Sequence, residues 1–184
     1  MRIIAGKFKG RRLKAPTWEG LRPSSDKLRE TLFNILAPRI EGARVVDGYA
    51  GTGAVGIEAI SRGAAHVSFV ERNRRATALI EQNLAVCGVR QGYTIHCGDV
   101  VSALRRLPPD TRFDVILLDP PYDADNVAEA LAAAAARLAS AGVLVLERAT
   151  RREADVPDAL TRVRDVKSGD STLTFMMRKD GTGR

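Results

Sequence analysis

Short apolar runs alternate along the chain with longer segments whose apolar residues recur at helical spacing. The runs have the length of buried strands, and the segments between them have the length of helices. Strands that alternate with helices are typical of parallel sheets, which are covered on both faces. The pattern therefore predicts an α/β fold. The predicted strands cover residues 44–47, 67–70, 93–97, 115–118 and 142–146.

A first helix is predicted after a loop that contains proline and serine. Ser24 or Ser25 can cap its start, and Pro38 is expected to end it. Its apolar stripe consists of Leu28, Leu32, Phe33, Ile35 and Leu36. Further helices are predicted for residues 54–62, 72–84 and 126–138.

The end of the chain departs from this alternation. Residues 161–166 and 172–177 are predicted strands, and the segment between them is rich in turn-forming residues. An antiparallel pair is therefore expected to close the sheet. No repeat or linker-like segment divides the chain, so we expect residues 1–184 to form one domain, with a basic arm at 1–22 and a core at 23–184.

Composition narrows the class of protein. The 184 residues suffice for one sizeable core. No apolar run approaches the ~20 residues of a membrane span, and the N-terminus lacks the apolar segment of a signal peptide. The two cysteines, Cys87 and Cys97, are too few and too far apart for a metal site, and His66 and His96 lack the spacing of metal ligands. We expect a cytoplasmic, monomeric protein with free thiols, no metal and no membrane partner.

The net charge of +7 is unevenly distributed. Residues 1–44 hold 11 Lys or Arg against 4 Asp or Glu, whereas residues 45–184 hold 18 of each. Apolar residues are interleaved with the first bases, which favours a folded hairpin or short strands over a solvated tail. Such a surface suits RNA or DNA phosphate. The candidate phosphate-binding residues are Arg2, Lys7, Lys9, Arg11, Arg12, Arg22 and Lys27, although Arg22 and Lys27 are equally compatible with a solvated face.

A glycine-rich turn follows the first predicted strand. Gly51, Gly53 and Gly56 match the dinucleotide fingerprint G-x-G-x-x-G, which alone is a weak signal. Asp47 at the strand end would repel a pyrophosphate, but it suits a ligand that carries an ammonium and a sulfonium group. The turn therefore favours S-adenosylmethionine over NAD.

Two further acids follow the second and third strands. Glu71 lies 20 residues after Gly51, the spacing at which an acid meets ribose hydroxyls, and Asp99 could accept from an adenine amino group. Both also precede helical patterns, where acids act as caps. Three acids at three successive strand ends favour an adenosine cofactor. The predicted cofactor site comprises Asp47, Tyr49, Gly51, Gly53, Glu71, Arg72, Asp99 and Asp119.

The fourth strand ends in Asp119, Pro120, Pro121 and Tyr122. Two prolines cannot continue a strand, so the carbonyls beside them are left without strand partners in a stiff turn. With the Asp119 carboxylate and the flat face of Tyr122, they make a site for a planar group with an amino substituent, such as a nucleobase. The alternative is a plain turn with Asp119 as its cap. These four residues are the predicted catalytic set.

The sequence resembles the RsmD family of class I methyltransferases. The resemblance is carried by residues 2–7, 10–13, 21–34, 47–56, Glu58, Ala59 and 119–122. It implies a seven-stranded Rossmann-like sheet with an N-terminal extension. It also implies methyl transfer from S-adenosylmethionine to guanine N2 of small-subunit (16S) ribosomal RNA, in an assembled or assembling subunit. Gly48 departs from the bulkier residue expected after Asp47.

Other functions stay open at this point. A DNA adenine-N6 methyltransferase would use the same Asp-Pro-Pro-Tyr turn, although 184 residues leave little room for a target-recognition region. A methyltransferase acting on a protein glutamine would present a similar nitrogen. From another class, the chain could be an NAD-binding oxidoreductase or a noncatalytic nucleotide-binding module.

Overall fold

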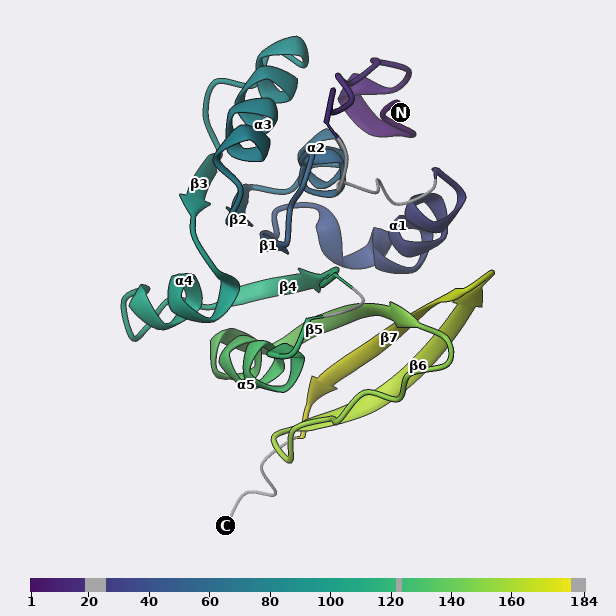
Figure 1. Ribbon diagram of the computed structural model, residues 1–184, viewed down its shortest axis with the longest axis vertical. Helices are drawn as coiled ribbons and strands as arrows, with labels where there is room; N and C mark the ends of the chain where they lie inside the picture. Colours follow the sequence, from purple (N-terminus) through teal and green to yellow (C-terminus); the bar gives the residue numbers. More distant parts are fainter. Residues whose placement is uncertain (19–25, 122–123, 180–184) are drawn as a thin grey trace.

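A seven-stranded sheet forms the centre of the computed structural model, which describes residues 1–18, 26–121 and 124–179 (Figure 1). The strand order is β3-β2-β1-β4-β5-β7-β6. The first five strands are parallel, and β7 is antiparallel to both β5 and β6. The predicted Rossmann-like sheet with a closing hairpin is thus confirmed. The bounds are β1 Arg44–Gly48, β2 His66–Glu71, β3 Tyr93–Cys97, β4 Phe113–Leu118, β5 Leu138–Ala149, β6 Leu160–Ser168 and β7 Ser171–Arg178.

Helices cover both faces of the sheet. One apolar cluster joins α1, α2 and α3 to side chains such as Val45, Leu117 and Val145, and a second joins α4 and α5 to their neighbours Val46 and Leu118. This division follows from the alternation of side chains along each strand. The helices are α1 Asp26–Ile40, α2 Ala54–Ser61, α3 Arg74–Val86, α4 Val100–Arg106 and α5 Val127–Arg137.

The register of the sheet aligns the ends of three central strands. Gly48 of β1 pairs with Leu118 of β4, and Leu118 pairs with Leu146 of β5. Asp119 and Glu147 therefore follow directly after paired residues. Because alternate residues share a face, both lie on the face that α1 covers.

The basic arm folds back on itself and packs against the core. Arg2 and Arg12 form an antiparallel bridge around a 3-10 turn, η1 (Gly6–Phe8), so the predicted hairpin is confirmed with little regular strand. Its amides at Ile4 and Ala5 donate to the buried Glu58 carboxylate of α2, at 2.8 and 3.0 Å. Figure 1 shows the arm beside α2 and α3.

The prediction that Pro38 ends the first helix is wrong. Helix α1 continues through Pro38 to Ile40, whose side chain is buried. Proline removes one hydrogen bond to the preceding turn. Because Pro38 lies close to the helix end, burial of Ile40 offsets this loss. The predicted caps Ser24 and Ser25 lie outside the described residues. Across the described ranges, no helix is long and apolar enough to cross a membrane.

Candidate active site at the carboxyl edge of the sheet

Asp47 lies buried where β1 enters the glycine turn. Its Oδ2 accepts a hydrogen bond from the Gly56 amide at 2.8 Å, and only 4% of the residue is exposed. Burial raises the pKa of Asp47 to about 7, against the lowering effect of the Gly56 amide and with a further increase from the Glu71 charge. A buried carboxylate with a raised pKa fits a cationic group in the space beside it.

Glu71, at the end of β2, holds the glycine turn in place. Its Oε2 accepts from the Gly51 amide at 2.9 Å, and its Oε1 accepts from the Asn73 amide at 2.8 Å. The turn itself bends at Gly51 and Gly53, whose φ values of 54° and 76° suit residues without a Cβ. Glu71 thus connects the ends of β1 and β2, where the predicted ribose site lies.

Tyr49, Arg72 and Asp99 form a second group of predicted cofactor residues. Tyr49 has a φ of 64°, the single positive value among the described residues other than glycine. Its pKa is raised by burial and by the Asp99 charge, while Arg72 lowers it, so the three side chains share one electrostatic environment. The Asp99 side chain accepts from the Ser102 amide at 2.8 Å, so the capping role also holds.

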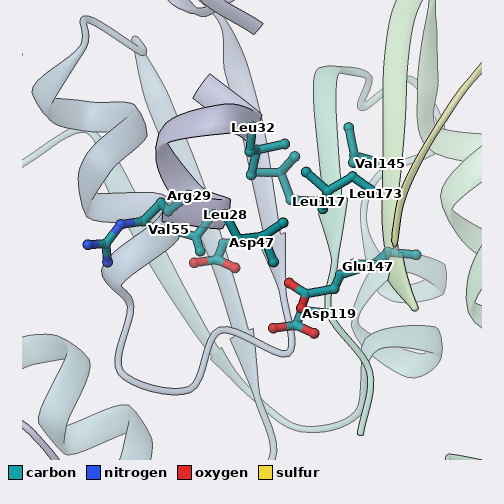
Figure 2. Close-up of a pocket in the computed structure, with 11 residues that line it drawn as sticks. Leu28, Arg29, Leu32, Asp47, Val55, Leu117, Asp119, Val145, Glu147 and Leu173 are labelled. Atoms are coloured by element: carbon teal, nitrogen blue, oxygen red, sulfur yellow. The ribbon is translucent and has the colours of Figure 1, made fainter. Parts of the chain in front are cut away.

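Three carboxylates border a small cavity on the α1 face of the sheet (Figure 2). Asp47 comes from the end of β1, Asp119 follows β4 and Glu147 lies near the end of β5. In Figure 2 the carboxylates of Asp119 and Glu147 are drawn next to one another. The cavity has a volume of about 30 Å³, room for a water molecule or two, so only the edge of a base could enter it. Its remaining lining is Leu28, Arg29, Leu32, Val55, Leu117, Leu118, Val145 and Leu173.

Glu147 was not among the residues predicted from the sequence. Residues 142–146 were expected to form a strand that ends just before it. The actual strand β5 runs from Leu138 to Ala149, so Glu147 lies inside a strand and pairs with Leu173 of β7. The available signal was its position in the fifth strand, equivalent to that of Asp119 after the fourth.

Arg29 brings a buried cation to the lining of the same cavity. Its Nη2 donates to Asp26 Oδ1 at 2.8 Å and to the Arg2 carbonyl at 2.6 Å. Figure 2 shows its guanidinium pointing away from Asp119 and Glu147. The acidic groups of the cavity are therefore not neutralised by Arg29.

The turn that contains Asp119, Pro120 and Pro121, here called the proline corner, lies between this cavity and a larger one. Asp119 is half-buried and faces the first cavity, and its amide lies 3.4 Å from the Gly48 carbonyl. Pro120 and Pro121 line the second cavity, of about 230 Å³, together with α5, the end of β5 including Glu147, and the segment after β5. Tyr122 lies outside the described residues.

The predicted phosphate-binding residues lie at the surface wherever the structure describes them. Arg2, Lys7, Lys9, Arg11, Arg12 and Lys27 are exposed, and Arg22 lies outside the described ranges. Arg11 also ties the arm to α3, because its Nη1 donates to the Val86 carbonyl at 2.7 Å. Within the described part of the chain, no cluster of three or more His, Cys, Asp or Glu could hold a metal ion.

A family model matches almost the whole chain. Residues 1–177 match the family described as "Conserved hypothetical protein 95". The chain belongs to this family. Its relatives include "Ribosomal RNA small subunit methyltransferase D" of Haemophilus influenzae, 40% identical over 66% of this chain, and the protein of the same name in Escherichia coli K12, 38% identical over 66%. The resemblance to the RsmD family is confirmed.

Solved structures of the family share the whole fold. The candidate methyltransferase yhhF of Escherichia coli has a TM-score of 0.85 and 29% identity, with 97% of this chain and 98% of that chain covered. The fold is that of class I methyltransferases. In the sequence comparisons, the matched segments span 64% of the Haemophilus protein and 60% of the Escherichia protein.

Proposed function

We propose that this chain transfers a methyl group from S-adenosylmethionine to the exocyclic N2 of a guanine in small-subunit ribosomal RNA. The observation that carries this proposal is the convergence of Asp47, Asp119 and Glu147 on one cavity at the carboxyl ends of three parallel strands. In open α/β sheets this edge is the place where ligands bind. Acidic groups there suit a cationic methyl donor and the amino edge of a base.

The residues present fit S-adenosylmethionine better than NAD. Asp47 would hold the ammonium group, Glu71 the ribose and Asp99 the adenine amino group, each at the end of its own strand. The glycine turn at Gly51 and Gly53 would allow close approach of the backbone. A pyrophosphate would meet the charges of Asp47 and Glu71. When bound, the cofactor would supply a methyl group on a sulfonium leaving group.

The proline corner would hold the target nitrogen. The N2 lone pair of guanine is delocalised into the ring, so the amino group is a poor nucleophile. Hydrogen bonds from its two protons to the Asp119 carboxylate and the Pro120 carbonyl would orient the lone pair and raise its electron density. The Asp119 carboxylate would also take the proton that N2 loses. Tyr122 is proposed to stack on the base.

The proposed RNA substrate rests on charge and on the family. The names of the two relatives describe ribosomal RNA small subunit methyltransferases. The exposed bases of the arm offer a phosphate-binding surface, and their number suits a large RNA or a small subunit during assembly.

Product analysis tests the proposal. The purified protein is incubated with isotope-labelled S-adenosylmethionine and small-subunit particles from cells that lack the enzyme, and the RNA is digested to nucleosides. We expect the label in N2-methylguanosine, at about one equivalent per particle. Label in N6-methyladenosine, label in protein, or a thermal shift with NAD but not with S-adenosylhomocysteine would reject it.

A further inference from the structure

Glu147 offers a second carboxylate beside the proposed amino-group site, and the proposed chemistry does not use it. The register places it next to Asp119, since Leu118 pairs with Leu146 and each acid follows its paired leucine. Both side chains line the cavity on the α1 face, and Figure 2 shows their carboxylates next to one another. Two acids from neighbouring strands thus face one small space.

The position of Glu147 is held by the hairpin that closes the sheet. Ser171 of β7 donates its hydroxyl to Glu147 Oε1 at 3.0 Å. Leu173 of β7 pairs with Glu147 and lines the same cavity. A carboxylate can accept at several lone-pair sites, and the bond from Ser171 helps to orient Glu147.

The edge of guanine next to N2 matches this pair of acceptors. Guanine presents N1–H beside N2–H₂, which makes three donor hydrogens along one edge. Adenine presents an acceptor nitrogen on either side of its amino group. A carboxylate beside the amino-group site therefore attracts guanine N1–H and repels the N1 lone pair of adenine.

We propose that Glu147 reads the N1–H of the target base and selects guanine over adenine, while Asp119 holds N2. The inference rests on the proposed function and adds to it the residue that sets base choice. A purely structural Glu147 would hold β5 against β7, with Ser171 as one of its contacts. The two roles predict different responses to a change in the base.

Base analogues at the target position separate these roles. 2-Aminopurine keeps the amino group at C2 but carries an acceptor at N1, whereas 7-deazaguanine keeps the whole donor edge of guanine. The kcat/KM of the wild-type protein should be at least about tenfold lower for 2-aminopurine than for guanine, as expected when one charged hydrogen bond is lost. It should be nearly unchanged for 7-deazaguanine.

Glu147→Gln should reduce this discrimination. Its amide N–H₂ can donate to N1 of 2-aminopurine, and its amide oxygen can still accept from Ser171. We expect the guanine to 2-aminopurine ratio to fall about tenfold or more, with the same melting temperature as the wild type. Ser171→Ala removes the hydroxyl that positions Glu147 and should lower the guanine to 2-aminopurine ratio in part, and Ser171→Thr should restore the ratio.

The outcomes keep the two levels of inference apart. Wild-type protein that forms no N2-methylguanosine rejects the proposed function itself. Wild-type protein that methylates guanine and 2-aminopurine equally well overturns the role of Glu147 alone, whether or not the Glu147→Gln variant folds. A folded Glu147→Gln variant that loses activity on both bases equally would also overturn it.

Discussion

Asp47 is the residue at which structure and proposed chemistry meet most closely. It is buried, and its carboxylate accepts a hydrogen bond from the Gly56 amide at 2.8 Å, which lowers its pKa. Burial has the larger effect and raises the pKa to about 7. In the absence of a cation, the neutral acid is therefore favoured below pH 7. A bound ammonium group would favour the carboxylate and lower its pKa again.

This gives a pH dependence with a defined sign. Because the ammonium group of the ligand binds the ionised acid, the affinity for S-adenosylhomocysteine should fall as the pH drops below about 7. The loss should approach tenfold per pH unit in the limit where only the ionised form binds. Calorimetric titration between pH 5.5 and 8 measures this loss of affinity, because that range extends about one to two pH units on each side of the transition.

Asp47→Asn provides the matched control. The variant should bind more weakly, with a flatter pH profile, because the remaining dependence belongs to the ligand. An unchanged profile in Asp47→Asn would assign the titration to another group.

At the scale of the elements, the arm and helix α2 behave as one unit. The Glu58 carboxylate is fully buried and accepts from the amides of Ile4 and Ala5 and from the Arg62 guanidinium. Ser61 Oγ adds a bond from the Phe8 amide at 2.9 Å. Since α2 begins at the glycine turn, the arm is anchored to the helix that leads out of the candidate cofactor site.

Glu58→Gln tests this anchor. The amide nitrogen would face a backbone donor, so a buried hydrogen bond is lost. The free energy of unfolding should fall by at least about 1.5 kcal/mol, and amide exchange at Ile4 and Ala5 should accelerate. Urea unfolding and hydrogen exchange measure both. The exposed Glu129→Gln should change stability by less than about 0.5 kcal/mol, and an equal loss in both variants would argue against the anchor.

Local patterns predicted the elements well because each buried strand is a short apolar run bounded by turn residues. They failed where tertiary packing decides. Helix α1 passes through Pro38 because Ile40 is buried, and β5 extends beyond its apolar run because β7 pairs with it as far as Ala149. The departure at Gly48 also has a packing account, since an added Cβ would lie 2.6 Å from Leu118 Cδ2.

The residues of the candidate site also divide into those that local patterns predict and one that depends on tertiary structure. Asp47, Glu71 and Asp119 could be predicted because they follow strands beside a glycine turn or a proline pair. Glu147 has no such local marker, and its place beside Asp119 depends on the register of β4 and β5. Pairing between distant segments is what a single sequence reveals least.

Across the whole molecule, exposed bases and buried acids gather in different places. The exposed bases of the arm lie beside α2 and α3, while the acids converge at the carboxyl edge of the sheet. The arm would therefore bind RNA phosphates, and the acidic cavity would bind the cationic donor and the base edge. The hairpin of β6 and β7 lies at the other end of the molecule in Figure 1.

This separation predicts a position-dependent effect of charge on RNA binding. Lys9→Ala combined with Arg12→Ala should reduce the slope of log affinity against log salt by about 1.4 to 1.8. Arg11 is left intact because it also anchors the arm to α3. The control removes two exposed bases from β6, Arg164 and Lys167, and should leave the slope nearly unchanged. Equal slopes for the two double variants would contradict a binding surface on the arm.

Asp119→Ala separates the proposed base site from the proposed cofactor site, because the base and the cofactor are assigned to different acids of one edge. Single-turnover methyl transfer and the Kd for S-adenosylhomocysteine are measured on the same preparation. Methyl transfer should fall at least about tenfold, the effect of one charged hydrogen bond in the transition state, while the Kd changes little. Equal losses in transfer and in cofactor affinity, or full activity, would contradict the account.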